Sequence, residues 1–133
     1  MSRQIIVPAT GLLPHRAYSP AVRVGNTLYV SGHTGSDPVT REIRSGIESQ
    51  TRQAFKNLQD VVEAAGGTMR DVVKVNIFMT DVANDLEGMN KVFREVFAEE
   101  PPARSTVGVA HLARPGLLLE IELVAVLPEE AGR

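Results

Sequence analysis

Two charged residue types in the last third of the chain have the chemistry to bind and process a small acid. Arg104 follows Pro101-Pro102 at the expected start of a strand, a position from which side chains often face a cleft. A guanidinium binds a carboxylate through two parallel hydrogen bonds and stays charged at working pH. The alternative for Arg104, from the sequence alone, is a surface ion pair that contributes little stability.

Two carboxylates lie inside the apolar segment near the C-terminus. Side chains alternate between the two faces of a strand, so Glu120 and Glu122 share one face and Leu119, Ile121 and Leu123 the other. Burying an isolated charge is very costly, so the carboxylates lie either in solvent or in a polar cleft. The two interpretations of these carboxylates are therefore an exposed sheet edge and a polar cleft.

Tyr18, Ser31 and Gly32 are further candidates for contact with a ligand. Tyr18 offers a ring to close a cleft and a hydroxyl to bond a substrate, or it is an amphipathic surface residue. Ser31 and Gly32 at a strand end offer a hydroxyl and a close backbone approach. Their simpler role is to form a turn.

The elements that must position these residues follow from hydrophobic spacing. Residues 21–24 and 27–31 flank Gly25-Asn26 and predict a β-hairpin, with a loop from Gly32 to Thr40. A 3.6-residue stripe predicts a helix over residues 47–65, with a capping box at Ser45 and Glu48 and an end at Gly66-Gly67.

The second half of the chain repeats this alternation. A β-branched run predicts a strand over residues 71–79, and a second stripe predicts a helix over residues 86–97, with a capping box at Asn84 and Glu87. Residues 105–109 and 117–127 predict two more strands. The order β-β-α-β-α-β-β indicates an α+β two-layer sandwich with both helices on one face of a mixed sheet.

Composition narrows the class of protein. The chain has 133 residues, enough for a single domain spanning 1–133, with a formal net charge of −2 and no run of basic residues, so nucleic-acid binding is not expected. There is no cysteine, which excludes thiolate chemistry and disulfides. The apolar stretches are too short for a membrane span or a signal peptide, which predicts a cytoplasmic protein.

Two common kinds of active site lack support in the sequence. His15, His33 and His111 have no metal-ligand spacing, so no metal site is expected. The chain also has no G-x-S-x-G nucleophile elbow of a serine hydrolase.

One pair of segments matches a known signature. Pro102-Ala103-Arg104-Ser105-Thr106-Val107 is followed by a turn and then by Leu119-Glu120-Ile121-Glu122. This resembles the C-terminal motif of the RidA (YjgF, L-PSP) family of imine and enamine deaminases. Weaker matches to the same family extend over nearly the whole chain: Ala17–Ala21, Leu28–Gly32, Gln53–Gly66, Val73–Val75 and Asp81.

The resemblance implies a fold, an activity and a set of site residues. It implies a chorismate-mutase-like protomer, a homotrimer with clefts between protomers, and a hydrolase that converts 2-imino and 2-enamino acids, such as 2-aminoacrylate, to 2-oxo acids and ammonia without a metal or organic cofactor. This is activity of the 2-iminobutanoate/2-iminopropanoate deaminase type. The implied catalytic residues are Arg104 and Glu120, and the implied substrate contacts are Arg104, Tyr18, Ser31, Gly32 and Thr106.

The chain departs from the family pattern at two positions. Arg16-Ala17 stands where the family often has Gly-Pro, so His15 and Arg16 bear on substrate range, and Thr106 stands where a cysteine is common. A binding module for small carboxylates on the same fold is the alternative function. An endoribonuclease, an older label for some relatives, is disfavoured by the net acidity.

Overall fold

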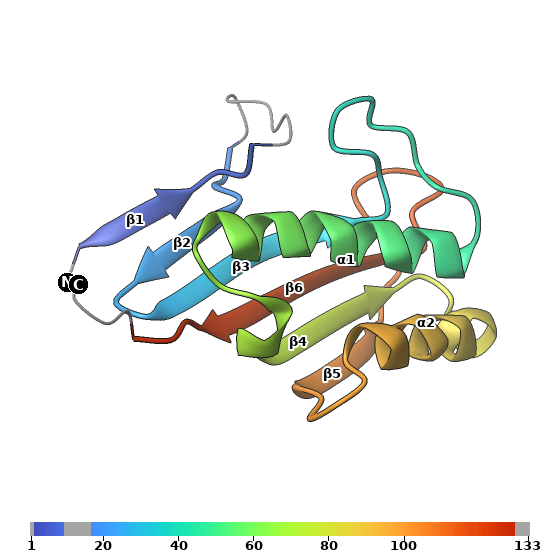
Figure 1. Ribbon diagram of the computed structural model, residues 1–133. Helices are drawn as coiled ribbons and strands as arrows, with labels where there is room; N and C mark the ends of the chain where they lie inside the picture. Colours follow the sequence, from blue (N-terminus) through green and yellow to red (C-terminus); the bar gives the residue numbers. More distant parts are fainter. Residues whose placement is uncertain (1, 10–16, 130–133) are drawn as a thin grey trace.

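The computed structural model describes residues 2–9 and 17–129 as a sheet covered on one face by two helices (Figure 1). Within these residues the strands form one six-stranded sheet in the order β1-β2-β3-β6-β4-β5. Neighbours are antiparallel except for the parallel pair β4–β5. This confirms the predicted α+β two-layer sandwich. The elements are β1 (Arg3–Ile6), β2 (Ala21–Val24), β3 (Thr27–Thr34), α1 (Ile47–Ala64), β4 (Val72–Met79), α2 (Val82–Val96), β5 (Ala103–Gly108) and β6 (Leu119–Val126), with a 3-10 turn at Met69–Asp71.

Two features of the sheet differ from the sequence prediction. Strand β1, which was not predicted, lies at the sheet edge and pairs with β2, with only Ile6 of its residues buried. Strand β3 runs on to Thr34, where a loop was expected from Gly32. Its last residues pair with β6, His33 opposite Ile121 and Thr34 opposite Glu120, after an irregularity that begins at Val30. Gly32 therefore lies within a strand rather than at its end.

The helix starts also differ in detail. Gly46 is the N-cap of α1 and no side chain caps it, so the predicted capping box at Ser45 is wrong. Helix α2 begins at Val82, because the Asp81 side chain accepts a hydrogen bond from Asn84 N and caps it, so the predicted capping box at Asn84 is also wrong. The predicted end of α1 is confirmed, with Gly66 at a φ of 90°. The Gly25-Asn26 hairpin is also confirmed, with Gly25 at a φ of 60°.

The core lies between the sheet and the helices. Leu119, Ile121 and Leu123 of β6 are buried together with Val75 and Ile77 of β4. They belong to the same core cluster as the inward faces of the helices, whose largest members are Phe55, Leu58, Val61, Val62, Met89, Val92 and Phe93. Each fully buried side chain of this size stabilises the fold by about 1.5–3 kcal/mol. The alternation along β6 thus fixes Glu120 and Glu122 on the face opposite the core.

That opposite face carries exposed apolar side chains. Tyr29 is 53% exposed and Val126 is 47% exposed, and Tyr29 pairs with Val124 across β3 and β6. Neither α1 nor α2 covers this face (Figure 1). In the described part of the chain, neither helix has the length and apolar character that a membrane crossing requires.

Candidate active site

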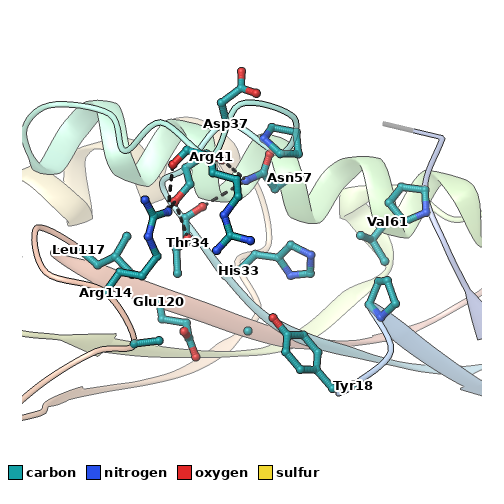
Figure 2. Close-up of a pocket in the computed structure, with 16 residues that line it drawn as sticks. Tyr18, His33, Thr34, Asp37, Arg41, Asn57, Val61, Arg114, Leu117 and Glu120 are labelled. Atoms are coloured by element: carbon teal, nitrogen blue, oxygen red, sulfur yellow. Dashed lines mark hydrogen bonds between the residues drawn. The ribbon is translucent and has the colours of Figure 1, made fainter. Parts of the chain in front are cut away.

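A cavity of about 310 Å³ opens where β2 and β3 separate. Strand β2 begins at Ala21, opposite Val30, so the residues of β3 after Ser31 have no pairing with β2. The space beside them is lined by Tyr18 and Pro20 and by Asn57 and Val61 of α1. Two loops also line it, one through Ser36, Asp37, Pro38 and Arg41 and the other through Ala113, Arg114 and Leu117. Figure 2 shows the lining residues, with the side chains of Arg41, His33 and Tyr18 around the cavity and the Asp37 carboxylate pointing away from it. Its volume is at the lower end of the range for ligand pockets, about 300–1,000 Å³.

Glu120 enters this cavity from the sheet. Its carboxyl lies directly against Gly32, because a Cβ at position 32 would be 2.8 Å from Glu120 Cδ. Burial raises the pKa of the Glu120 carboxyl, and the nearby Glu122 raises it further. Glu122 accepts a hydrogen bond from Asn76 Nδ2 at 3.1 Å, whereas within residues 2–9 and 17–129 no donor reaches the Glu120 carboxyl. Glu120 is therefore a carboxyl that can gain or release a proton in a sheltered site.

Ser31 holds the Tyr18 segment in place. Its hydroxyl donates to Ser19 O at 2.6 Å, and its backbone N donates to Pro20 O at 3.0 Å. Tyr18 lines the cavity and remains 52% exposed. The Ser31 side chain is not itself part of the cavity lining, so its observed role is positional, and its predicted contact with substrate stays a prediction.

The far rim of the cavity carries residues that the sequence analysis did not single out. Arg114 Nη1 donates to Arg41 O at 2.9 Å and to Ser36 Oγ at 3.5 Å. Asn57 Nδ2 donates to Thr34 O at 3.2 Å and to Ser36 O at 2.9 Å. The side chains of Arg114 and Asn57 thus tie three separate segments together. The only sequence signals for them were the turn around Arg114 and a polar position on the inner face of α1.

Arg104 and Thr106 lie elsewhere, on the edge strand β5, and are not part of the cavity lining. Arg104 Nη1 donates to Asn90 Oδ1 at 2.8 Å, and the guanidinium carbon is 4.7 Å from the centre of the Phe93 ring. Asn90 was missed by the sequence analysis, although it is a polar residue directly after Met89 in the apolar stripe of α2.

Arg104 and Thr106 are both partly buried. Burial lowers the pKa of the Arg104 guanidinium, which nevertheless stays charged at neutral pH. Thr106 Oγ1 is a buried oxygen without a hydrogen-bond partner in the described part of the chain. Buried hydroxyls normally find a partner, so this position suits a group supplied by a ligand or by another molecule.

The described histidines do not form a metal site. His33 lines the cavity, with its Nδ1 2.7 Å from Ser31 O, and His111 is exposed outside it. Residues 2–9 and 17–129 contain no group of three His, Asp or Glu residues able to hold a metal ion. The two residues expected to influence substrate range, His15 and Arg16, lie outside the described residues.

Comparisons with known proteins place this geometry in a family. The sequence profile described as Endoribonuclease L-PSP matches residues 9–127. A 2-iminobutanoate/2-iminopropanoate deaminase from Dermatophagoides farinae is 45% identical over 126 residues, which cover 94% of this chain and 97% of that protein. The chain belongs to the RidA (YjgF, L-PSP) family.

Further relatives agree with this placement. The Homo sapiens protein named 2-iminobutanoate/2-iminopropanoate deaminase is 37% identical to this RidA-family chain over 110 residues, 82% of this chain and 79% of that protein. The crystal structure of RidA from the Antarctic bacterium Psychrobacter sp. PAMC 21119 superimposes with a TM-score of 0.86 at 42% identity, covering 93% of this chain and 99% of that one. Sequence and fold therefore identify the same family.

Proposed function

We propose that this protein is a hydrolase that deaminates 2-imino and 2-enamino acids to 2-oxo acids and ammonia, without a metal or organic cofactor. The observation that carries the proposal is the Glu120 carboxyl, which lies in a cavity against Gly32 with its pKa raised by burial. A raised pKa brings a carboxyl closer to the pH at which it exchanges protons efficiently. The names of the relatives at 45% and 37% identity support the same reaction.

The reaction follows from the chemistry of the imine carbon. An enamine substrate first takes its imine form, with a proton added at carbon. Glu120 then accepts a proton from water as the water oxygen bonds to the imine carbon, and passes that proton to the nitrogen, which gives a neutral carbinolamine. The hydroxyl proton of the carbinolamine next moves through Glu120 to the nitrogen as the C–N bond breaks, so that ammonia leaves and the 2-oxo acid remains. Arg104 binds the substrate carboxylate through its planar fork.

The proposal includes a site shared between protomers of a homotrimer. Arg104 lies on the edge strand β5 and faces α2, whereas the cavity of the same chain is lined by Glu120, Gly32 and Tyr18. A second chain that presents its own Arg104 and Thr106 to this cavity would unite the two groups. The exposed apolar face around Tyr29 and Val126 supports association, because apolar patches on soluble proteins often mark interfaces. We further propose that the protein acts in the cytoplasm.

The first experiment measures the decay of 2-aminoacrylate generated in situ, with and without protein. Arg104→Ala should abolish deamination while leaving the fold intact, and Arg104→Lys should also fail, because a point charge does not replace a fork. Wild-type rates in Arg104→Ala would show that the assignment of Arg104 is wrong. Binding of 2-oxobutanoate without any accelerated decay would instead identify a binding module.

A second set of variants tests the carboxylate. Glu120→Gln should lower turnover more than ligand binding, because the lost group acts on water rather than on the substrate carboxylate. Glu122→Gln is the matched control, since Glu122 lies on the same face of β6 but accepts a hydrogen bond from Asn76 Nδ2. An equal loss of turnover in both variants would mean that the wrong carboxylate was chosen.

The shared site is tested by mixing inactive subunits. If Arg104 of one chain meets the Tyr18 segment of another, mixtures of Arg104→Ala and Tyr18→Ala chains should regain part of the activity, because some sites then contain both intact residues. Light scattering should report a trimer. A monomer at micromolar concentration that remains fully active would refute both the trimer and the shared site.

A further inference from the structure

The loop between β3 and α1 holds an arginine in an unusual backbone conformation beside the cavity. Arg41 has a φ of 68°, in the left-handed region that bulky residues rarely adopt. Two hydrogen bonds hold it there: Arg41 N donates to Asp37 O at 2.9 Å, and Arg114 Nη1 donates to Arg41 O at 2.9 Å. When the surroundings fix a residue in a strained conformation, its side chain is a candidate for a function.

The Arg41 side chain extends into the cavity, toward His33 (Figure 2). Within residues 2–9 and 17–129, no group accepts a hydrogen bond from its guanidinium and no carboxylate forms an ion pair with it. The neighbouring cation is different, because Arg44 forms ion pairs with Asp37 at 3.3 Å and with Glu42 at 3.2 Å. Arg41 therefore brings a positive charge to the cavity that the surrounding protein does not neutralise.

The acidic groups around the cavity leave this charge available. The Asp37 carboxylate points away from the cavity in Figure 2, and its Oδ1 accepts hydrogen bonds from Val39 N and Thr40 N, both at 2.9 Å. Glu120 enters the same cavity from the sheet, whereas Arg41 enters from the loop. One cavity thus holds a carboxyl suited to proton transfer and, separately, an unpaired guanidinium suited to an anion.

We infer that Arg41 selects imino acids whose side chain ends in a second carboxylate, such as 2-iminoglutarate. The inference rests on the proposed deamination and specifies the substrate class of that site. In this arrangement Arg104 binds the 2-carboxylate, Glu120 serves the imine carbon, and Arg41 binds the distal carboxylate. Arg114 acts as a positioning residue, because it holds the Arg41 carbonyl and so fixes where the guanidinium enters.

The test compares kcat/KM for 2-iminoglutarate and 2-iminobutanoate, each generated in situ by an amino-acid oxidase. Arg41→Asn removes the guanidinium while keeping a residue that tolerates the left-handed conformation. The kcat/KM for 2-iminoglutarate divided by that for 2-iminobutanoate should fall about tenfold in Arg41→Asn. A tenfold change corresponds to the lower end of the energy of a hydrogen bond to a charged group. Arg94→Gln is the charge control, because Arg94 is exposed on α2 and lies outside the cavity lining, and it should leave the ratio unchanged.

A binding measurement separates this inference from the proposed function. The dissociation constants of the products 2-oxoglutarate and 2-oxobutanoate, measured by calorimetry, need no turnover, and their ratio should shift in the same direction in Arg41→Asn. A wild-type protein that hydrolyses neither imine refutes the proposed function. A wild-type protein that hydrolyses 2-iminobutanoate, with both ratios unchanged in Arg41→Asn, refutes the role of Arg41 alone.

Discussion

The contact between Gly32 and Glu120 gives a sharp test of how the carboxyl is positioned. In Gly32→Ala the new Cβ would be 2.8 Å from Glu120 Cδ and 3.0 Å from Glu120 Cγ. Ordinary carbon contacts begin near 3.5 Å, so the carboxyl must move by at least about 0.7 Å. Because Glu120 is the end of a flexible side chain rather than backbone, it can move aside and the fold should survive.

The cost of this displacement should appear in catalysis. A misplacement of about 1 Å at a reacting centre costs about 100-fold, so we expect kcat/KM for 2-iminobutanoate to fall by about 10–100-fold in Gly32→Ala. The free energy of unfolding, measured by urea denaturation, should change by less than about 1 kcal/mol. Gly108→Ala is the matched control, because Gly108 is also a strand glycine, but its added Cβ would lie 3.3 Å from a Val82 methyl and 3.9 Å from Met79 O, and would not touch Glu120. The activity of Gly108→Ala should remain near that of the wild type.

A double variant shows whether the effect passes through Glu120. If Gly32→Ala acts by displacing the carboxyl, it should cause little further loss in a Glu120→Gln background, because groups that act as a unit are not additive. Wild-type kcat/KM in Gly32→Ala would refute the positioning argument. An equal loss in both backgrounds would refute it too, since Gly32 would then act on the substrate directly.

Two further predictions concern stability. In Gly35→Ala the added Cβ would be 2.6 Å from Gln50 O, a backbone atom of α1 that cannot rotate away, so we expect a loss of about 2–3 kcal/mol in urea denaturation; an unchanged midpoint would contradict this. The pKa of Glu120 is raised in the folded protein, so the stability that its protonated form provides is complete below the ordinary carboxyl pKa, about 4.3, and is lost as the pH rises through the raised pKa. Glu120→Gln should therefore gain stability relative to wild type as the pH rises above about 4.3, and a pH-independent difference would show that folding does not raise the pKa of Glu120.

The sequence by itself determined those features that depend on neighbours in the chain. Alternation from Leu119 to Leu123 placed Glu120 and Glu122 on the face opposite the core, because successive side chains of a strand point in opposite directions. The apolar stripes located both helices for the same kind of reason. The family motif around Arg104 added the expected chemistry, although it could not show that Arg104 faces α2 rather than the cavity.

The tertiary structure decided what depends on residues far apart in the chain. Strand β1 contributes one buried side chain and is held by backbone pairing with β2, so its sequence lacks the apolar alternation that predicts a strand. Gly32 lies under a carboxyl 88 positions later, and Arg114 holds the carbonyl of Arg41, 73 positions earlier. Such contacts arise only when the sheet brings β3 beside β6 and the loops that carry Arg41 and Arg114 meet at its end. The periodicity of a local segment cannot predict which two loops come into contact.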